Sequence, residues 1–515
     1  MPDRFTARLR RHVRTPRQKF VATAVTASVV LGFGTYGFTR LTTPENRSCA
    51  EGVARPLDSA ECIGVNGSGH DFGEADLKDV TESIRAENAS LKAGEYVTVA
   101  VLLPLTSTDS GMRIKVLHEV QGAYAYQRRA NQESNGQRPT IRLVLANTGQ
   151  GNAHWRTVVD RLVAMADGPD RLRAVSGIAT SSGEMREAVA ALTHAKVAVV
   201  GTTITADDIA NGPGRKPFPG LARVSPTNGD EARALANFGR VDAAKALLVQ
   251  DTRSGDHYVD TLKAAFAQSL KRAPLEPQEF TSAPDSTQEG TTANTFVNIT
   301  HLICDTRTET VFFAGRHTQL RQFINALGDR GCVDRAFTVL TGDEGSYLGA
   351  DEKLDRKALK KKVTVRYAAL AHPDAWQPAP GRQIPRTGGS PQAYADFLAD
   401  IAKAAPKDRP VALSDGQAII AYDAMATAVH AIRQATPEGV AYPSKEDVGT
   451  QWPQVKGSLR VQGASGWICL DNYGNPYNKA VPIVELAQDG SPRFVQTAWP
   501  EGRPPTSTCL PPKKG

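Results

Sequence analysis

The apolar stretch VTVAVLL, residues 97–103, is followed by Pro104 and then by a segment with apolar residues at helical spacing between Val116 and Gln127. A short run rich in valine is typical of a buried strand, and a recurrence every three to four residues is typical of an amphipathic helix. The same alternation continues along the chain, with expected strands at 141–146, 172–177 and 197–200 and expected helices at 158–165 and 182–194. Strands that alternate with helices predict a doubly wound parallel sheet.

The alternation restarts near Ala244. Strands are expected at 246–250, 310–314 and 337–340, with helices at 258–270 and 319–327 between them, and a longer helix at 414–432. Turn residues fill Pro226–Gly229, where the first sheet would be complete. We therefore predict an α/β fold with two doubly wound parallel-sheet lobes, and a first crossing between them near Pro226.

The N-terminus carries a different signal. Residues 20–38 contain no charged residue and are about long enough to cross a bilayer as a helix, and the segment before them is rich in arginine. Basic residues before a first apolar span keep that side cytoplasmic, so the rest of the chain is expected outside the cell. A cleaved secretory signal peptide is the alternative. An uncleaved anchor is favoured because no clear cleavage site and no lipid-accepting cysteine follow the span.

Charge and cysteine content exclude several classes of protein. Most of the formal net charge of +7 lies in the N-terminal arm, so the remainder offers no basic surface for nucleic acid. The six cysteines all follow the apolar span, as expected in an oxidising compartment. Their spacing suits no zinc site, and no metal or cofactor is expected. Of fifteen connectivities we predict Cys49–Cys62, Cys304–Cys332 and Cys469–Cys509.

Five groups of short motifs follow one another along the chain, and their order and spacing are informative. They are VLLPLT at 101–106, QGAY at 121–124, AVSG at 174–177, VAVVGTT at 197–203, and GW at 466–467 with LDNYGN at 470–475. Each is weak alone. Together, from about Val97 to Ala498, they resemble the type I periplasmic-binding-protein family, specifically the branched-chain amino-acid class of ABC-transporter substrate-binding proteins. The resemblance implies two lobes joined by a three-strand hinge, with further crossings near Lys360 and Lys456.

The expected parts follow from this resemblance and from the N-terminal pattern. They are a cytoplasmic basic arm (1–19), a transmembrane anchor (20–39), an extracellular stalk (40–95), a first lobe (96–225 and 361–455), a second lobe (226–360 and 456–498) and a Pro-rich C-terminal tail (499–515).

Open α/β sheets bind ligands outside the carboxyl ends of their strands. In the first lobe, Ser181 and Ser182 precede a helix whose first turn favours an anionic group. The resemblance assigns Ser181 to a ligand carboxylate, and Thr203 and Thr205 to a ligand ammonium. The alternative is that these hydroxyls only cap helices.

In the second lobe, Glu344 occupies the position where the resembled family often carries an acid for the ligand ammonium, and it aligns better than Asp343. A solvated turn is the alternative. The chain departs from the family at 314–317, where Arg316 stands in place of an aromatic residue and could reach a second anionic group. It departs again at 251–258, where Asp256 and Tyr258 are the residues left to close the cleft. These departures leave the identity of the ligand open.

Three classes of function compete. No GxSxG elbow, P-loop, zinc-ligand helix or GxGxxG fingerprint occurs, so an enzyme is disfavoured. The leading prediction is a membrane-tethered extracellular protein that captures a small amino-acid-like ligand, or a related carboxylate, and delivers it to an ABC permease, since a tether raises the effective concentration at a transporter. The alternative is an extracellular sensor that acts through a partner membrane protein.

Overall fold

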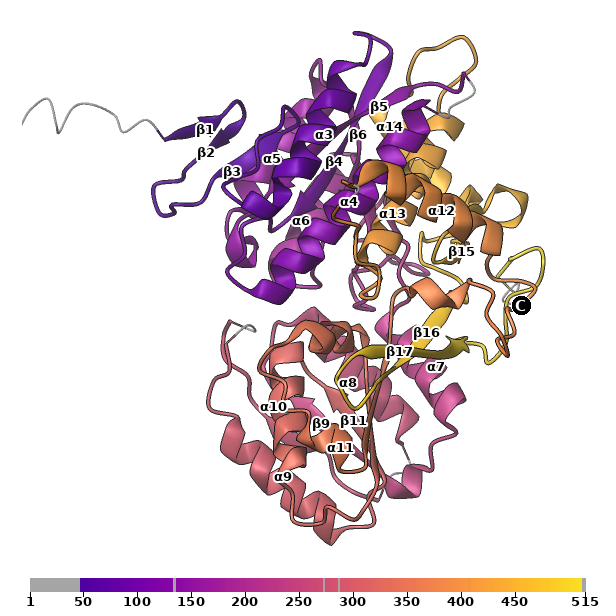
Figure 1. The fold of residues 1–515 in the computed structure, drawn as a ribbon. Helices are drawn as coiled ribbons and strands as arrows, with labels where there is room; N and C mark the ends of the chain where they lie inside the picture. The colour runs from indigo at the N-terminus through magenta and orange to yellow at the C-terminus, as the bar shows by residue number, and fades with distance from the viewer. Residues whose placement is uncertain (1–46, 133–135, 272–273, 286–287, 407, 512–515) are drawn as a thin grey trace, which may run out of the picture. The chain divides into compact units, whose positions relative to one another are not determined.

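The computed structural model describes residues 47–132, 136–271, 274–285, 288–406 and 408–511 (Figure 1). The chain divides into two compact units, Met1–Ser48 and Cys49–Gly515. The predicted basic arm and apolar span lie outside the described residues. Among the residues that are described, no helix is long and apolar enough to span a membrane.

The first sheet has eight strands in the described part of the chain, and its centre is parallel. In spatial order they are β1 (Ser48–Ala50), β2 (Val53–Ala54), β3 (Ile63–Asn66), β5 (Thr140–Asn147), β4 (Tyr96–Leu103), β6 (Leu172–Gly177), β7 (Ala198–Gly201) and β8 (Leu221–Arg223). Every strand expected from the alternation in this lobe is present.

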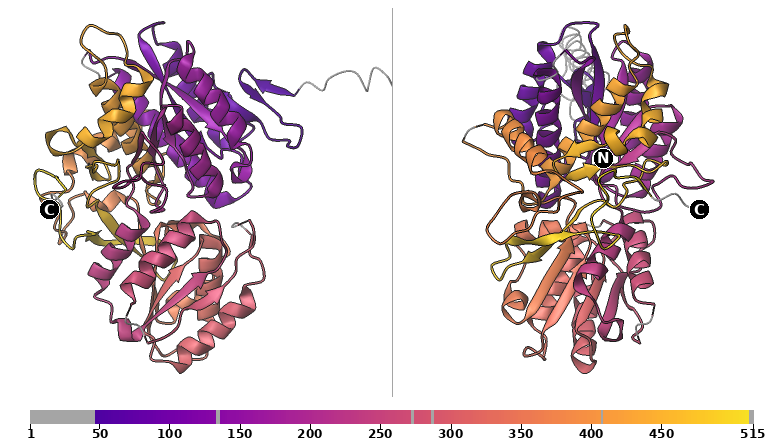
Figure 2. Two further views of the ribbon diagram at one scale, coloured as in Figure 1. Left: turned by 180° about the vertical axis from the view of Figure 1, so that it is seen from behind. Right: turned by 90° about the vertical axis from the view of Figure 1, so that its right-hand side faces the viewer.

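Helices cover both faces of this sheet (Figure 2). One face packs on α3 (Lys78–Ala89), α4 (Ser110–Gln132) and α13 (Gln417–Gln434), and the other on α5 (Trp155–Asp167) and α6 (Gly183–His194). Side chains of β4 alternate between the two cores: Val97, Val99 and Val101 enter the first, whereas Ala100 and Leu102 enter the second. A strand buried on both sides explains the continuous apolar run in the sequence.

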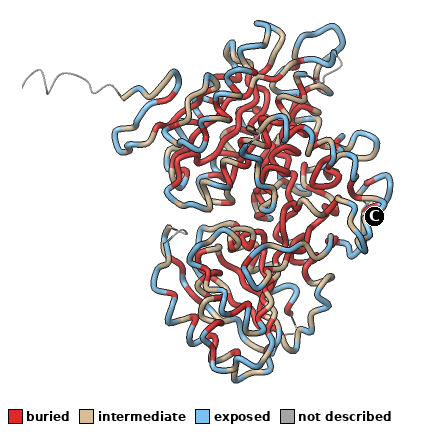
Figure 3. Tube along the Cα trace, in the orientation of Figure 1, coloured by how far each residue is buried: buried red, intermediate tan, exposed pale blue. Residues whose placement is uncertain are grey.

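The second sheet has seven strands in the described residues. Their order is β10 (Gln278–Phe280), β9 (Ala246–Asp251), β11 (Thr310–Ala314), β12 (Phe337–Thr341), β13 (Val363–Ala368), β16 (Val481–Leu486) and β17 (Pro492–Ala498). The first five run parallel, and the last two join antiparallel. Its faces are covered by α7 (Asn228–Gly239) and α8 (His257–Ser269) on one side and by α9 (Ala293–Asp305), α10 (His317–Gly328) and α11 (Lys357–Lys360) on the other. In Figure 3 the buried residues run through both sheets.

The chain passes between the lobes three times in the described residues, but not at all the predicted places. The first crossing lies between β8 and α7, as predicted, with Thr227 capping α7. The second prediction is wrong: β13 pairs with β12, so the chain stays in the second lobe until Ala368 rather than leaving it near Lys360. It then enters α12 (Pro391–Ala404).

The third predicted crossing, near Lys456, is also too early. The hairpin β14 (Val461–Gly463) and β15 (Gly466–Ile468) contributes Val461 and Ile468 to the core of the first lobe. The chain returns to the second lobe only at β16, which begins at Val481. Both errors arise because β13, β14 and β15 mix polar residues or glycine with their apolar residues, and such segments resemble loop sequence when their partners are unknown.

Residues 49–95 do not form a stalk. Strand β3 pairs antiparallel with β5 and extends the first sheet. Asn88 of α3 donates its side-chain N–H groups to the carbonyls of Gly67 and Leu143, at 2.8 and 2.7 Å. Ile84 of the same helix is buried in the first-lobe core. This segment is therefore an integral part of the lobe, and the prediction of a stalk is wrong for it.

The three predicted disulfides are all present. Cys49 pairs with Cys62, Cys304 with Cys332, and Cys469 with Cys509. The last of these ties the Pro-rich tail to the segment that follows β15.

Candidate ligand-binding site

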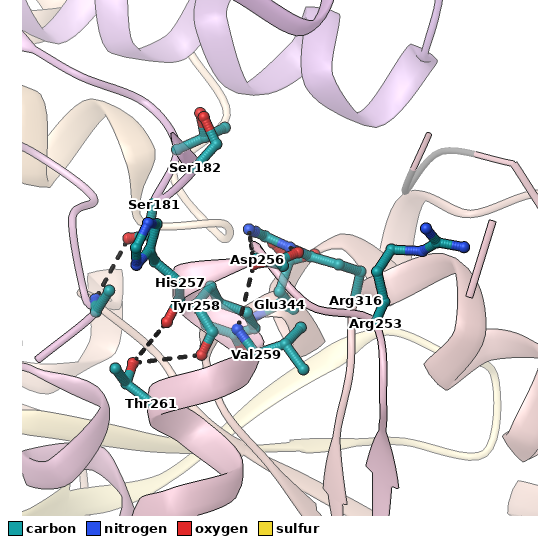
Figure 4. A network of polar contacts seen from close by, with 12 residues as sticks. Ser181, Ser182, Arg253, Asp256, His257, Tyr258, Val259, Thr261, Arg316 and Glu344 are labelled. Carbon is teal, nitrogen blue, oxygen red and sulfur yellow. Dashed lines mark hydrogen bonds and ion pairs between the residues drawn. The ribbon is translucent and has the colours of Figure 1, made fainter. Parts of the chain in front are cut away.

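The predicted site residues of both lobes follow the carboxyl ends of strands, as expected for an open α/β sheet. Ser181 and Ser182 lie between β6 and α6, and Thr203 and Thr205 follow β7. Arg316 follows β11 in the second lobe. Glu344 follows β12 and Tyr258 lies in the first turn of α8. Figure 4 shows the part of this group that includes Ser181, Tyr258, Arg316 and Glu344.

The two serines have different partners. Ser182 is the N-cap of α6, and its side chain accepts the N–H of Met185 at 3.4 Å. The Ser181 hydroxyl accepts the N–H of Ala206 at 3.3 Å. The Ser181 carbonyl accepts the N–H of Tyr258 at 3.2 Å, which links a loop of the first lobe to a helix of the second. Ser182 therefore has the capping role, whereas Ser181 joins three segments.

The two threonines also differ. Thr203 donates its hydroxyl to the carbonyl of Ala179 at 2.7 Å and accepts from Lys115 Nζ at 3.1 Å. The Thr205 hydroxyl is buried and has no hydrogen-bond partner among the described residues. Since buried hydroxyls are normally paired, Thr205 is the threonine whose hydroxyl remains free for a ligand.

Lys115 and Glu119 of α4 are residues that the sequence prediction missed. Both are buried, and Lys115 Nζ lies 4.0 Å from Glu119 Oε1. Lys115 also donates to the carbonyl of Ala179. Burial raises the pKa of Glu119, and Lys115 opposes this shift. A Lys and a Glu four residues apart usually mark an exposed helix face, so the sequence carried no signal of a buried pair.

Arg316 and Glu344 are brought together by the fold. The Arg316 guanidinium donates to both oxygens of Asp256 at 2.7 Å and to Glu344 Oε1 at 2.8 Å. The other oxygen of Glu344 accepts the backbone N–H of His317 at 3.0 Å. Burial alone would raise the pKa of the Glu344 carboxyl, but Arg316 and His317 hold it well below its ordinary value. Glu344 is thus an ionised acid whose charge is already balanced.

Tyr258 lies beneath this network. Its ring is buried, with the Arg316 guanidinium 4.6 Å from its centroid. Its hydroxyl oxygen accepts the N–H of Glu344 at 3.4 Å. Burial raises the pKa of the Tyr258 hydroxyl well above its ordinary value, so it stays neutral. Beside it, His257 Nδ1 lies 2.6 Å from Asp208 Oδ2 of the first lobe.

A second acid pair lies next to Tyr258, and sequence reasoning missed its first member, Glu231. Glu231 belongs to the first turn of α7, and its Oε2 accepts the N–H of Asp343 at 3.1 Å. Both side chains are buried, and each has one carboxyl oxygen without a hydrogen-bond partner in the described residues. Burial raises the pKa of Asp343 to about 7 and also raises the pKa of Glu231.

Two cavities of about 400 and 250 Å³ lie in the first lobe, lined by α4 together with α12 and neighbouring segments, and neither is lined by a predicted site residue. Among the described residues, no group of three or more His, Cys, Asp or Glu side chains could hold a metal ion.

No family model matches this sequence, and no curated protein matches it. Solved structures do match the fold. The leucine-binding protein of Thermotoga maritima is 17% identical with a TM-score of 0.54, over 79% of this chain and 100% of its own. The branched-chain amino-acid transporter substrate-binding protein of Streptococcus pneumoniae, solved with isoleucine, is 14% identical with a TM-score of 0.55, over 78% and 99%.

A solute-binding protein of an ABC transporter from Rhodopseudomonas palustris HaA2, solved with p-hydroxybenzoic acid, is 17% identical with a TM-score of 0.56, over 78% of this chain and 96% of its own. The chain therefore has the type I periplasmic-binding fold shared by ABC-transporter substrate-binding proteins. The resemblance seen in the sequence is confirmed at the level of the fold.

Proposed function

We propose that this protein is an extracellular solute-binding protein that captures a small amino-acid-like ligand or related carboxylate between its two lobes for an ABC importer, without chemical change to the ligand. The observation that carries the proposal is the meeting of polar loops from both sheets. Ser181 and Thr205 come from the first lobe, and Tyr258 and Glu344 come from the second. Three chain crossings allow two rigid lobes to rotate about a ligand without unfolding.

A thermal-shift screen tests this proposal. The full chain is heated with single amino acids, short peptides and aromatic carboxylates, and a compound at a hundred times its dissociation constant should add roughly 2.7 kcal/mol to the free energy of unfolding. The variants Ser181→Ala and Thr205→Val should reduce the shift. Ser269→Ala, an exposed serine of α8, is the matched control and should leave it unchanged. A screen in which no compound raises the melting temperature contradicts the proposal.

The N-terminal segment is proposed to tether the protein to the cell membrane as a single pass, with the N-terminus cytoplasmic and the binding unit outside. Carbonate extraction of membranes checks the tether: the full chain should remain in the pellet, and a chain lacking residues 1–39 should be released. Recovery of the full chain in the supernatant would contradict it.

A sensor that signals through a partner membrane protein is the second candidate. Uptake of labelled ligand separates the two, because deletion of an importer's binding protein abolishes uptake whereas deletion of a sensor leaves it intact.

A further inference from the structure

Four of the buried side-chain oxygens without hydrogen-bond partners in the described residues can be linked along one path. They belong to Thr205, Glu231, Asp343 and Glu119. The Thr205 carbonyl accepts the N–H of Asn228, which shares the first turn of α7 with Glu231. Glu231 Oε2 accepts the N–H of Asp343, and at the other end Glu119 Oε1 lies 4.0 Å from Lys115 Nζ, which donates to Thr203 in the same loop as Thr205.

Three of these four unpartnered atoms belong to carboxyl groups. Glu119, Glu231 and Asp343 each offer a carboxyl oxygen, which accepts hydrogen bonds when the group is ionised, and the Thr205 hydroxyl can accept or donate. Native proteins rarely leave buried polar groups unpaired, and such groups call for a ligand or another specific cause. A set of buried acceptors is completed by a group that carries several N–H donors. It is not completed by an aliphatic side chain such as that of leucine.

The acid pair Glu231 and Asp343 forms the centre of this path. Their side chains are 0% and 7% exposed, and no ion pair to either is found in the described residues. Gly342 makes their approach to Tyr258 possible, since a Cβ there would lie 2.6 Å from the Tyr258 hydroxyl and 2.9 Å from Glu231 Oε2. Two cations that act on Asp343 are hydrogen-bonded to other groups: Arg316 to Asp256 and Glu344, and Lys115 to Ala179 and Thr203.

We propose that Glu231 and Asp343 bind a cationic, N–H-rich group of the solute, an ammonium or a guanidinium. This group is separate from the part of the solute that contacts the loop carrying Glu344. The ligand class is then a small basic amino acid or amine rather than an aliphatic amino acid. This inference rests on the proposed solute-binding function and specifies the ligand that the same residues accept.

Isothermal titration of the full chain with matched ligand pairs tests the inference. L-arginine is compared with L-citrulline, and L-lysine with L-norleucine, because each pair has nearly the same shape and differs in the side-chain cation. The cationic member should bind at least about tenfold more tightly, since hydrogen bonds between charged groups are the strong ones. Glu231→Gln and Asp343→Asn should each remove most of this preference. Glu309→Gln, an exposed acid paired with Lys245, is the control and should preserve it.

A second measurement needs no ligand. If Glu231 and Asp343 serve ligand binding at a cost to stability, Glu231→Gln and Asp343→Asn should raise the melting temperature of the ligand-free protein, because each removes a buried carboxyl that no cation balances. Binding of L-norleucine or L-citrulline as tightly as the cations would overturn the inference and leave the proposed function standing. A lowered melting temperature in both variants, with no binding by either member of either pair, would count against both.

Discussion

Replacing Arg316 by methionine removes a side chain that hydrogen-bonds both Asp256 and Glu344. Methionine retains most of the length of the side chain and no charge. The side chains of Arg316, Asp256 and Glu344 are 11%, 18% and 9% exposed, so the change leaves two largely buried carboxylates without their cation. Removing one partner of a buried ion pair costs about 3–5 kcal/mol. We expect the free energy of unfolding to fall by that amount, measured by urea denaturation followed by circular dichroism.

Two further variants make this result interpretable. Arg156→Met breaks an exposed ion pair with Glu187 and should cost no more than about 1 kcal/mol. The double variant Arg316→Met with Glu344→Gln should regain part of the lost stability, because one of the unpaired charges is gone. A cost for Arg316→Met no larger than that of Arg156→Met would refute the conclusion that Arg316 balances Glu344 inside the protein.

The remaining predictions concern the N-terminal segment, the acid pair and a disulfide. Ile84→Ala should lower the free energy of unfolding, measured in urea, by about 2–5 kcal/mol, because Ile84 is a core residue. An unchanged value would contradict the conclusion that residues 49–95 are part of the first lobe. Burial raises the pKa of Asp343 from 3.8 to about 7, so the folded protein holds the extra proton and stability due to this group falls as pH rises from about 4 to 7. Asp343→Asn should lack that decline, so the pH–stability curves of the parent and the variant should diverge between about pH 4 and 7, and parallel curves would contradict the shift. Loss of the Cys304–Cys332 bond, which closes a separation of 28 residues, by the double alanine variant should cost roughly 3–4 kcal/mol in the same denaturation assay, and a cost near zero would contradict it.

Much of the fold follows from local patterns in this one sequence. The stretch 97–103 is apolar on both faces of β4, and the helix expected at 414–432 corresponds to α13, which is buried nearly all round. Strands such as β3 and β13 were not predicted, because their apolar residues alternate with glycine or polar residues and each strand depends on pairing with a distant partner. That dependence explains both misplaced crossings and the mistaken stalk.

The position of Ser181, Thr205 and Glu344 after strand ends was predictable from sequence, and the structure has them there, whereas their pairings were not predictable. Their contact with a ligand stays a prediction. Arg316 and Glu344 are 28 positions apart, and the sequence does not show that they share a hydrogen bond. Each was therefore interpreted as a separate contact to the ligand. Glu231 carried no signal at all, since an acid in the first turn of a helix is ordinary.

Solute binding between the lobes is tested most directly by native mass spectrometry of the full chain, released from detergent after incubation with an equimolar mixture of amino acids and small carboxylates. A ligand site between the lobes predicts a single ligand mass, bound once per chain and lost in Ser181→Trp, where a large ring enters the contact between Ser181 and Tyr258. Ser269→Trp, on the exposed side of α8, should retain the ligand. No adduct on the parent protein, or an adduct that Ser181→Trp leaves intact, would contradict a ligand site between the two lobes.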